Sequence, residues 1–503
     1  MNDVASGTEP VVQITAGRIA GARVDGVVRF LSVPYAAPPL GDLRFLRPQP
    51  HEPWDGVRPA LTPGPSAPQH TPKRQPLEGL SLDALIGDGA IPGEEFLAAN
   101  IWTPDPNASG LPVMVFIHGG AFLFGSKDAP IYDGAAFARS GVVLIAINYR
   151  LGLEGFVHIP GGDSNLGLRD QIAALEWVRD NAAAFGGDSA NVTVFGESAG
   201  AMTIADLVAS PLAKGLFRRA IVQSGHGALV RNIPTALRLT RLIAKRLKVS
   251  PDIQGFRSRS LEDSLAAVAW ASEPNVRVDL RDERKREPTL GLSKFLPVWG
   301  DDVLPDPPME ALKKGAGAEI DLLIGSNRDE MNLYFVPTGV RRKIGGLLAR
   351  FMLSRVQPKA GAVLRDYGLG RKGVRAGDAL TEAMTDLMFR WPARRFAEEH
   401  QGRTHVYEFG WPSDACLGQL GACHGLELPF VFDTLACASG PQGLCGANPP
   451  QDLARSTHRI WVDFARDGSL PWPPYSRADR QVYALETGAS AAEPVPPAAA
   501  HLP

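Results

Sequence analysis

This sequence has few cysteines, no long apolar runs and almost no net charge. Four cysteines in 503 residues are too few for a disulfide scaffold. The longest apolar runs, such as residues 142–147, have the length of a strand and are far too short to cross a membrane. The formal net charge is −2, and no basic stripe stands out. We therefore expect neither a nucleic acid nor a membrane as a partner.

The amino terminus has no feature of a targeting segment. Residues 1–7 contain neither a basic nor an apolar stretch, so no secretory signal is visible. With 44% hydrophobic and 21% charged residues, the composition is that of an ordinary globular protein. We therefore expect a cytoplasmic protein that buries a large core of its own.

Apolar runs and helical patterns alternate from residue 111 onward. Runs typical of strands buried on both faces occupy residues 112–118, 142–148, 191–195, 219–223, 321–325 and 404–409. Residues 165–185 and 199–210 have helical spacing. This order of elements predicts an α/β protein with a mostly parallel sheet flanked by helices.

The remaining segments are placed around this pattern. Residues 230–290 and 335–400 are helical and charged, and we expect them to form caps beside the sheet. We expect a single domain over residues 13–485 with a short tail at 1–12. Residues 486–503 are rich in alanine and proline and are expected to be a disordered tail.

The most informative motif is Gly-Glu-Ser-Ala-Gly at residues 196–200. It lies between a predicted strand and a predicted helix, where the glycines let the chain turn sharply and expose Ser198 at the sheet edge. Chance supplies about 0.3 such pentapeptides in a chain with this many glycines, so the motif gains its weight from the elements around it. Ser198 is therefore the predicted nucleophile.

A second motif, His-Gly-Gly-Ala-Phe at residues 118–122, follows its own predicted strand. Two backbone amides of this loop and the amide of Ala199 can together hold a negatively charged oxygen. Small residues are needed there because a larger side chain would block the substrate. The alternative is a glycine-rich turn without a function. His118 itself is expected to be structural and to pack under the loop.

Further motifs follow one another in order along the chain. They are Phe-Leu-Ser-Val-Pro-Tyr-Ala at 30–36, Asn-Ile-Trp-Thr-Pro at 100–104, Asn-Tyr-Arg-Leu-Gly at 148–152, Gly-Leu-Arg-Asp-Gln at 167–171, Phe-Gly-Gly-Asp at 185–188 and Gln-Ser-Gly at 223–225. With them the sequence resembles the type-B carboxylesterase family over residues 13–485. The resemblance implies the α/β-hydrolase fold and cleavage of carboxylic esters through an acyl-enzyme, with no cofactor and no metal.

The resemblance also assigns site residues. It implies Glu330 as the catalytic acid and His424 as the catalytic base, and the chain order Ser, Glu, His is the one that this fold uses. The oxyanion donors would be the amides of Gly120, Ala121 and Ala199.

The residues alone leave these roles open. Asp329 or Glu330 can instead cap a helix, and His226 and His405 are rivals of His424. Glu197 and Ser224 are expected near the triad in supporting roles.

Two departures from the family pattern bear on the site. The family usually has glycine where this chain has Met331; if a left-handed backbone is needed there, methionine costs about 1 kcal/mol and reshapes the Glu330 loop. Many relatives also close the loop of residues 67–96 with a cysteine pair, where this chain has Ala67 and Phe96. The absence of both cysteines suits a reducing compartment.

The four cysteines cluster around the proposed catalytic histidine. We expect free, partly buried thiols, with a disulfide or a metal site as alternatives that the lack of Cys-x-x-Cys spacing disfavours. The residues are Cys416, Cys423, Cys437 and Cys445.

The expected partner is a small to medium neutral ester in an apolar pocket bordered on its acyl side by residues 227–230. The loop 67–96 lacks the tryptophan with which cholinesterases bind quaternary ammonium groups, so a choline ester is not expected. The same triad also serves amide, carbamate and lactone hydrolases and acyltransferases. A catalytically silent binding protein is a remote alternative, because Ser198 is intact.

Overall fold

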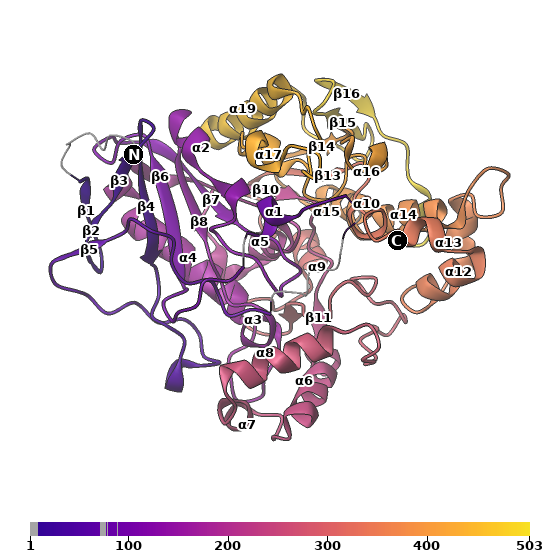
Figure 1. Ribbon diagram of the computed structural model, residues 1–503, viewed down its shortest axis with the longest axis horizontal. Helices are drawn as coiled ribbons and strands as arrows, with labels where there is room; N and C mark the ends of the chain where they lie inside the picture. The colour runs from indigo at the N-terminus through magenta and orange to yellow at the C-terminus, as the bar shows by residue number, and fades with distance from the viewer. Residues whose placement is uncertain (1–8, 71–76, 78, 88, 503) are drawn as a thin grey trace.

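The computed structural model describes residues 9–70, 77, 79–87 and 89–502. Its centre is a sheet with the strand order β16-β15-β14-β13-β10-β9-β7-β8-β6-β4-β3 (Figure 1). Neighbours from β15 to β8 are parallel and the remaining pairs are antiparallel. The predicted α/β architecture with a mostly parallel sheet is confirmed.

The strands of this sheet have the following bounds: β3 (Ala22–Val24), β4 (Val27–Pro34), β6 (Ala98–Thr103), β7 (Leu111–Ile117), β8 (Val143–Ile147), β9 (Gly187–Glu197), β10 (Arg219–Gln223), β13 (Asp321–Asn327), β14 (Thr404–Phe409), β15 (Gln481–Ala484) and β16 (Ala489–Ala492). A small separate sheet contains β1 (Val11–Ile14), β2 (Gly17–Ala20) and β5 (Val57–Pro59). Because β1 begins at Val11, the expected tail of residues 1–12 is wrong for its last two residues. Residues 1–8 lie outside the described part of the chain.

Strand β7 explains why helices cover both faces of the sheet. Val113 and Val115 belong to one apolar core, together with residues of α4 (Leu166–Asn181) and α5 (Ala199–Ala209). Met114 and Phe116 belong to the other core, together with residues of α17 (Leu428–Val431) and α19 (Gln451–Asp467). Successive side chains of a strand point to opposite faces. A strand that is apolar at every position therefore needs a layer of helices on each side.

Helices occupy both segments that were expected to form caps. In the first, α6 (Ile233–Leu247), α7 (Ile253–Arg257) and α8 (Leu261–Ser272) form a lobe at the bottom of Figure 1. The second contains α11 (Val340–Lys343), α12 (Gly346–Ser354), α13 (Ala360–Asp366), α14 (Ala376–Thr385), the π-helical turn η5 (Asp386–Arg390) and α15 (Trp391–Glu399). Figure 1 places α12 and α13 at the end of the molecule opposite the amino-terminal strands.

The expectation of a disordered tail at residues 486–503 is wrong for the part that the structure describes, which ends at Leu502. Strand β16 pairs antiparallel with β15. The buried guanidinium of Arg394 binds the carboxylate of Glu493 at 2.8 Å, and Trp391 Nε1 donates a hydrogen bond to the Leu502 carbonyl at 2.7 Å. Backbone pairing, hydrogen bonds and ion pairs of Glu486 and Glu493 with arginines attach this segment. A composition poor in large apolar residues reveals none of these contacts.

Candidate active site

The candidate nucleophile lies on a strained turn between β9 and α5. Ser198 has φ 55° and ψ −124°, a backbone conformation that costs about 1–3 kcal/mol. A Cβ atom at Gly196 or Gly200 would lie 2.4 or 2.0 Å from the carbonyl oxygen of Ile117. The turn therefore requires both glycines of the motif, and it holds Ser198 at the carboxyl ends of the parallel strands.

The structure brings the three predicted triad residues together. Ser198 Oγ lies 2.8 Å from His424 Nε2, and His424 Nδ1 lies 2.6 Å from Glu330 Oε2. The second carboxylate oxygen of Glu330 accepts the backbone N–H of Asn327 at 2.8 Å. Both Glu330 and His424 are buried. A carboxylate that accepts a hydrogen bond from Nδ1–H leaves Nε2 free to accept the serine proton.

The rival residues lie in other environments. Asp329 accepts the backbone N–H of Ala422 at 3.0 Å and so supports the loop that carries the histidine. His226 is buried and hydrogen-bonded to the Met388 carbonyl at 2.6 Å. His405 lies within strand β14. None of these three hydrogen-bonds to Ser198 within the described residues.

Met331 does not need a left-handed backbone. Its φ of −74° and ψ of −6° lie in the right-handed helical region, so the strain considered for this position is absent. The side chain is fully buried, and the backbone N–H donates a hydrogen bond to Thr385 Oγ1 at 3.2 Å. The loop thus accommodates methionine as a core residue behind Glu330.

The candidate oxyanion loop presents unused hydrogen-bond donors. Gly120, Ala121 and Ala199 line the same cavity as Ser198. Gly120 has φ 116° and Ala121 has φ 54°, so the chain bends in the left-handed region. None of the three backbone N–H groups donates a hydrogen bond within the described chain. Donors of this kind beside a nucleophile are what a tetrahedral oxyanion needs.

His118 lies beneath this loop as a structural residue, as the sequence indicated. Its ring is buried and stacks on Tyr149 with a centroid distance of 4.6 Å. His118 Nδ1 lies 2.8 Å from the Gly119 carbonyl oxygen. Burial lowers the pKa of His118 to about 4, so the ring is neutral at neutral pH and supports the loop without adding a charge.

Glu197 lies next to the triad. Its Oε1 lies 3.0 Å from His424 Nε2 and forms an ion pair with the ring when the ring is protonated. The same Nε2 lies 2.8 Å from Ser198 Oγ. Burial lowers the pKa of His424, but the carboxylates of Glu197 and Glu330 outweigh this effect and hold the pKa well above its usual value. Two carboxylates therefore stabilise the protonated imidazole.

Ser224 makes no direct contact with the triad through hydrogen bonds. Its backbone N–H donates to the Gly325 carbonyl at 2.9 Å, and its φ is 53°. The hydroxyl is buried and has no hydrogen-bond partner among the described residues. The supporting role expected for this serine therefore stays a prediction.

A buried polar network behind the histidine was not assigned from the sequence. Gln223 accepts a hydrogen bond from Trp461 Nε1 at 3.0 Å and donates one to Glu427 at 3.1 Å. Asn327 donates hydrogen bonds to Glu427 at 2.6 Å and to the Cys423 carbonyl at 2.7 Å. Burial raises the pKa of Glu427 to about 8. The signal in the sequence was an acidic residue within an apolar stretch, three positions after His424.

A mainly apolar cavity of about 400 Å³ surrounds Ser198. The rings of Phe389 and Tyr334 lie 4.8 and 5.7 Å from the His424 ring. Leu229 lines this cavity, whereas residues 227, 228 and 230 line a larger neighbouring cavity of about 530 Å³ that does not contain Ser198. Only Leu229 of the expected acyl-side segment therefore borders the catalytic cavity.

Within the described residues the four cysteines form no disulfide: Cys416, Cys423, Cys437 and Cys445. Among the described residues, no group of three or more His, Cys, Asp or Glu side chains is arranged to hold a metal ion. Within the same residues we find no helix with the length and hydropathy of a membrane span. Ala67 and Phe96, which replace the family's cysteine pair, are both buried in the first core.

A serine on a tight turn at the carboxyl edge of a mostly parallel sheet, hydrogen-bonded to a histidine that contacts a buried carboxylate, is typical of the α/β-hydrolase class. Within that class the chain belongs to the carboxylesterase family, whose family model matches residues 8–495. It is accordingly a carboxylic ester hydrolase.

Known proteins resemble the chain over almost its whole length. It is 35% identical to the para-nitrobenzyl esterase of Bacillus subtilis (strain 168), covering 95% of both chains. It is also 35% identical to the phenmedipham hydrolase of Pseudarthrobacter oxydans, covering 94% of both. A solved structure of PNB esterase superposes with a TM-score of 0.81 at 32% identity, covering 95% of this chain and 96% of the other.

Proposed function

We propose that this protein hydrolyses small to medium neutral carboxylic esters by forming an acyl-enzyme on Ser198. The observation that carries the proposal is the continuous series of hydrogen bonds from Ser198 through His424 to Glu330. His424 Nε2 takes the hydroxyl proton as Ser198 Oγ attacks the ester carbonyl carbon. Glu330 keeps the proton of Nδ1 in place and stabilises the imidazolium that forms.

The tetrahedral intermediate then collapses to the acyl-enzyme. The carbonyl oxygen carries the negative charge, and the amides of Gly120, Ala121 and Ala199 stabilise it, each donor being worth about 10²–10³ in rate. His424 returns its proton to the departing alcohol as the bond between carbon and alkoxy oxygen breaks. Water, deprotonated by His424, then attacks the acyl carbon, and the acid leaves as Ser198 recovers its proton.

The lining of the catalytic cavity supports neutral substrates. Its walls are mainly leucine and aromatic side chains, and its volume of about 400 Å³ suits a small to medium ester. Glu197 places a carboxylate in the cavity next to the histidine, which disfavours anionic substrates close to Ser198 by repulsion.

A second candidate activity comes from the similarity to a phenmedipham hydrolase. The same triad can transfer the acyl group of an amide, carbamate or lactone, or pass it to an alcohol in place of water. We propose ester hydrolysis as the main activity because para-nitrobenzyl esterases are found among the relatives by sequence and also among the similar solved structures.

A matched substrate series tests this proposal. We expect para-nitrophenyl esters of short and medium acyl chains to give a much higher kcat/KM than the para-nitroanilides of the same acids. Phenmedipham and a lactone complete the series. Equal or faster turnover of the anilides, or turnover of phenmedipham alone, would contradict the proposed substrate class. The cytoplasmic location and the absence of a nucleic-acid partner stay predictions.

A further inference from the structure

One cap segment concentrates positive charge that the balanced composition of the whole chain conceals. Residues 341–375 contain ten lysines and arginines and one acidic residue, Asp366, which gives a net charge of +9. The complete chain has a net charge of −2. The segment includes α11, α12 and α13, and we call it the basic lobe. Figure 1 shows α12 and α13 at one end of the molecule, away from the central sheet.

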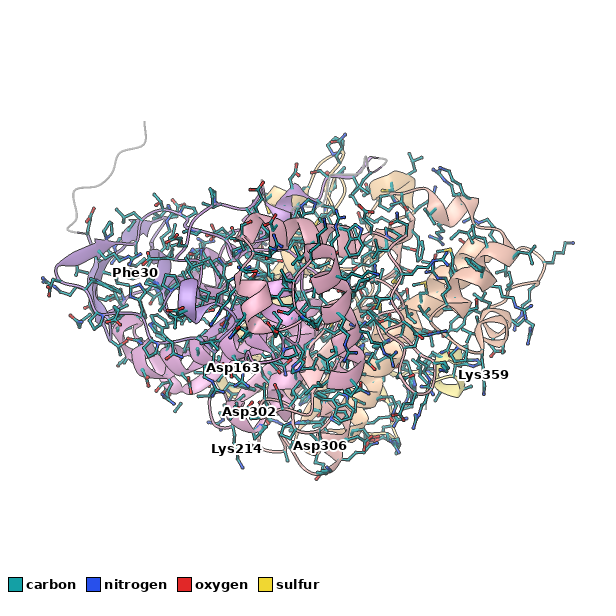
Figure 2. All side chains as sticks on the ribbon, turned by 90° about the horizontal axis from the view of Figure 1, so that it is seen from below. Phe30, Asp163, Lys214, Asp302, Asp306 and Lys359 are labelled. Carbon is teal, nitrogen blue, oxygen red and sulfur yellow. The ribbon has the colours of Figure 1, made fainter. Side chains whose placement is uncertain are left out.

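Most cations of the basic lobe face solvent without a carboxylate partner. Arg341 and Arg375 form ion pairs with Asp378. Exposed cations that form no ion pair within the described residues include Arg350, Arg355, Lys359, Arg365, Arg371 and Lys372. Figure 2 shows Lys359 near the end of the molecule. Their field is therefore not neutralised locally, and it favours an anionic partner.

Helix α12 adds apolar side chains to the same surface. Leu347 is 89% exposed, Leu348 is 48% exposed and Phe351 is 58% exposed. The opposite side of the helix is anchored in the protein, because Ala349 and Leu353 are buried. Large apolar side chains next to one another on a surface mark a site of interaction. A leucine at 89% exposure does not lie in a groove, so the partner must accept a protruding apolar surface.

We propose that the basic lobe binds the surface of an anionic phospholipid bilayer. Leu347, Leu348 and Phe351 enter the boundary between headgroups and acyl chains, and the lysines and arginines around them contact the lipid headgroups. A second copy of the chain does not fit, since two such lobes would repel each other. A nucleic acid would match the charge but would gain nothing from three exposed apolar side chains. This binding does not depend on catalysis at Ser198, and it revises the expectation that no membrane is a partner.

The test is co-sedimentation of the full-length protein with vesicles of phosphatidylcholine alone or mixed with phosphatidylserine. One variant, L347S/L348S/F351S, removes the apolar side chains, and a second, R350E/R355E/K359E, reverses three charges. The matched control is L212S/K214E, which changes an exposed leucine and an exposed lysine outside the basic lobe. Figure 2 shows Lys214 well apart from Lys359. All substituted residues are exposed, so we expect every variant to fold. Unchanged thermal unfolding and unchanged ester hydrolysis in solution would verify this.

We expect binding to the mixed vesicles to exceed binding to phosphatidylcholine by at least about tenfold, because each cation near an anionic surface contributes about fivefold. High salt weakens this binding, and each lobe variant weakens it by about tenfold or more. The control variant binds like the wild type. No preference for phosphatidylserine, or unchanged binding of both lobe variants, would overturn the proposal. The proposal would also be overturned if only the charge-reversal variant lost vesicle binding, because that result indicates adsorption without insertion. A dimer in solution that only the apolar variant dissociates would overturn it as well, because the exposed apolar side chains would then bind a second copy of the chain.

Discussion

The substitution Glu330→Gln tests the role of the acid with almost no change of shape. One oxygen of Glu330 accepts the N–H of Asn327 at 2.8 Å, and the other lies 2.6 Å from His424 Nδ1. In glutamine, the amide oxygen must stay toward Asn327, because an NH₂ group there would face another donor. The NH₂ group then faces Nδ1, which becomes an acceptor, so the ring proton moves to Nε2. An imidazole in that tautomer cannot take the proton of Ser198.

The expected loss is about 10⁴-fold in kcat, as for other triads in which the acid becomes an amide, and it corresponds to about 5 kcal/mol of activation free energy. The assay is para-nitrophenyl acetate hydrolysis, with active sites counted by fluorophosphonate titration and folding checked by thermal unfolding. Asp329→Asn is the matched control, since Asp329 contacts Ala422 and not the histidine; it should lose far less activity. A loss below about tenfold for Glu330→Gln would refute the assignment of the acid.

Two further predictions concern the surroundings of the triad. The imidazole must be neutral to act as a base, so activity falls as the pH drops through the pKa of His424, which the carboxylates of Glu197 and Glu330 hold above its usual value. Glu197→Gln removes one of these charges and should move the acidic limb of the kcat/KM profile to lower pH by about one unit; an unmoved or raised limb would contradict this. Met331→Gly, which restores the family residue, should destabilise the protein by about 3 kcal/mol or more in urea unfolding, because it removes a buried side chain from a right-handed backbone. Unchanged or increased stability would show that methionine is strained there.

The parts of the site that depend on local chain geometry could be predicted from the sequence. The turn at Ser198 needs glycines at fixed positions between a strand and a helix. The glycines, the apolar run before them and the helical pattern after them are all visible in adjacent residues of the sequence. The sheet was predictable for the same reason, since continuous apolar runs are what strands buried on both faces require. Glu330 and His424 came from the family resemblance, because their approach to Ser198 depends on tertiary packing over more than 90 residues.

The features that the sequence did not reveal depend mainly on contacts between residues distant in sequence. The backbone at Met331 is fixed by the packing of its side chain and by Thr385, neither of which a family pattern specifies. The carboxyl-terminal segment is ordered by β15 and by Arg394. The overall charge does not reveal the basic lobe, because its cations are balanced by acidic residues elsewhere in the chain. The place of Glu427 in the buried network depends on hydrogen bonds from Gln223 and Asn327, which are about 200 and 100 residues away in sequence.

The most direct test of the central claim is to identify the residue that reacts with a fluorophosphonate probe. Mass spectrometry of the intact protein and of its peptides should find one adduct per chain, on Ser198, with esterase activity lost in proportion to labelling. The Ser198→Ala variant should fold normally, take up no label and lose about 10⁶-fold in kcat. Labelling at a different residue, or substantial esterase activity in Ser198→Ala, would contradict the assignment of Ser198 as the nucleophile.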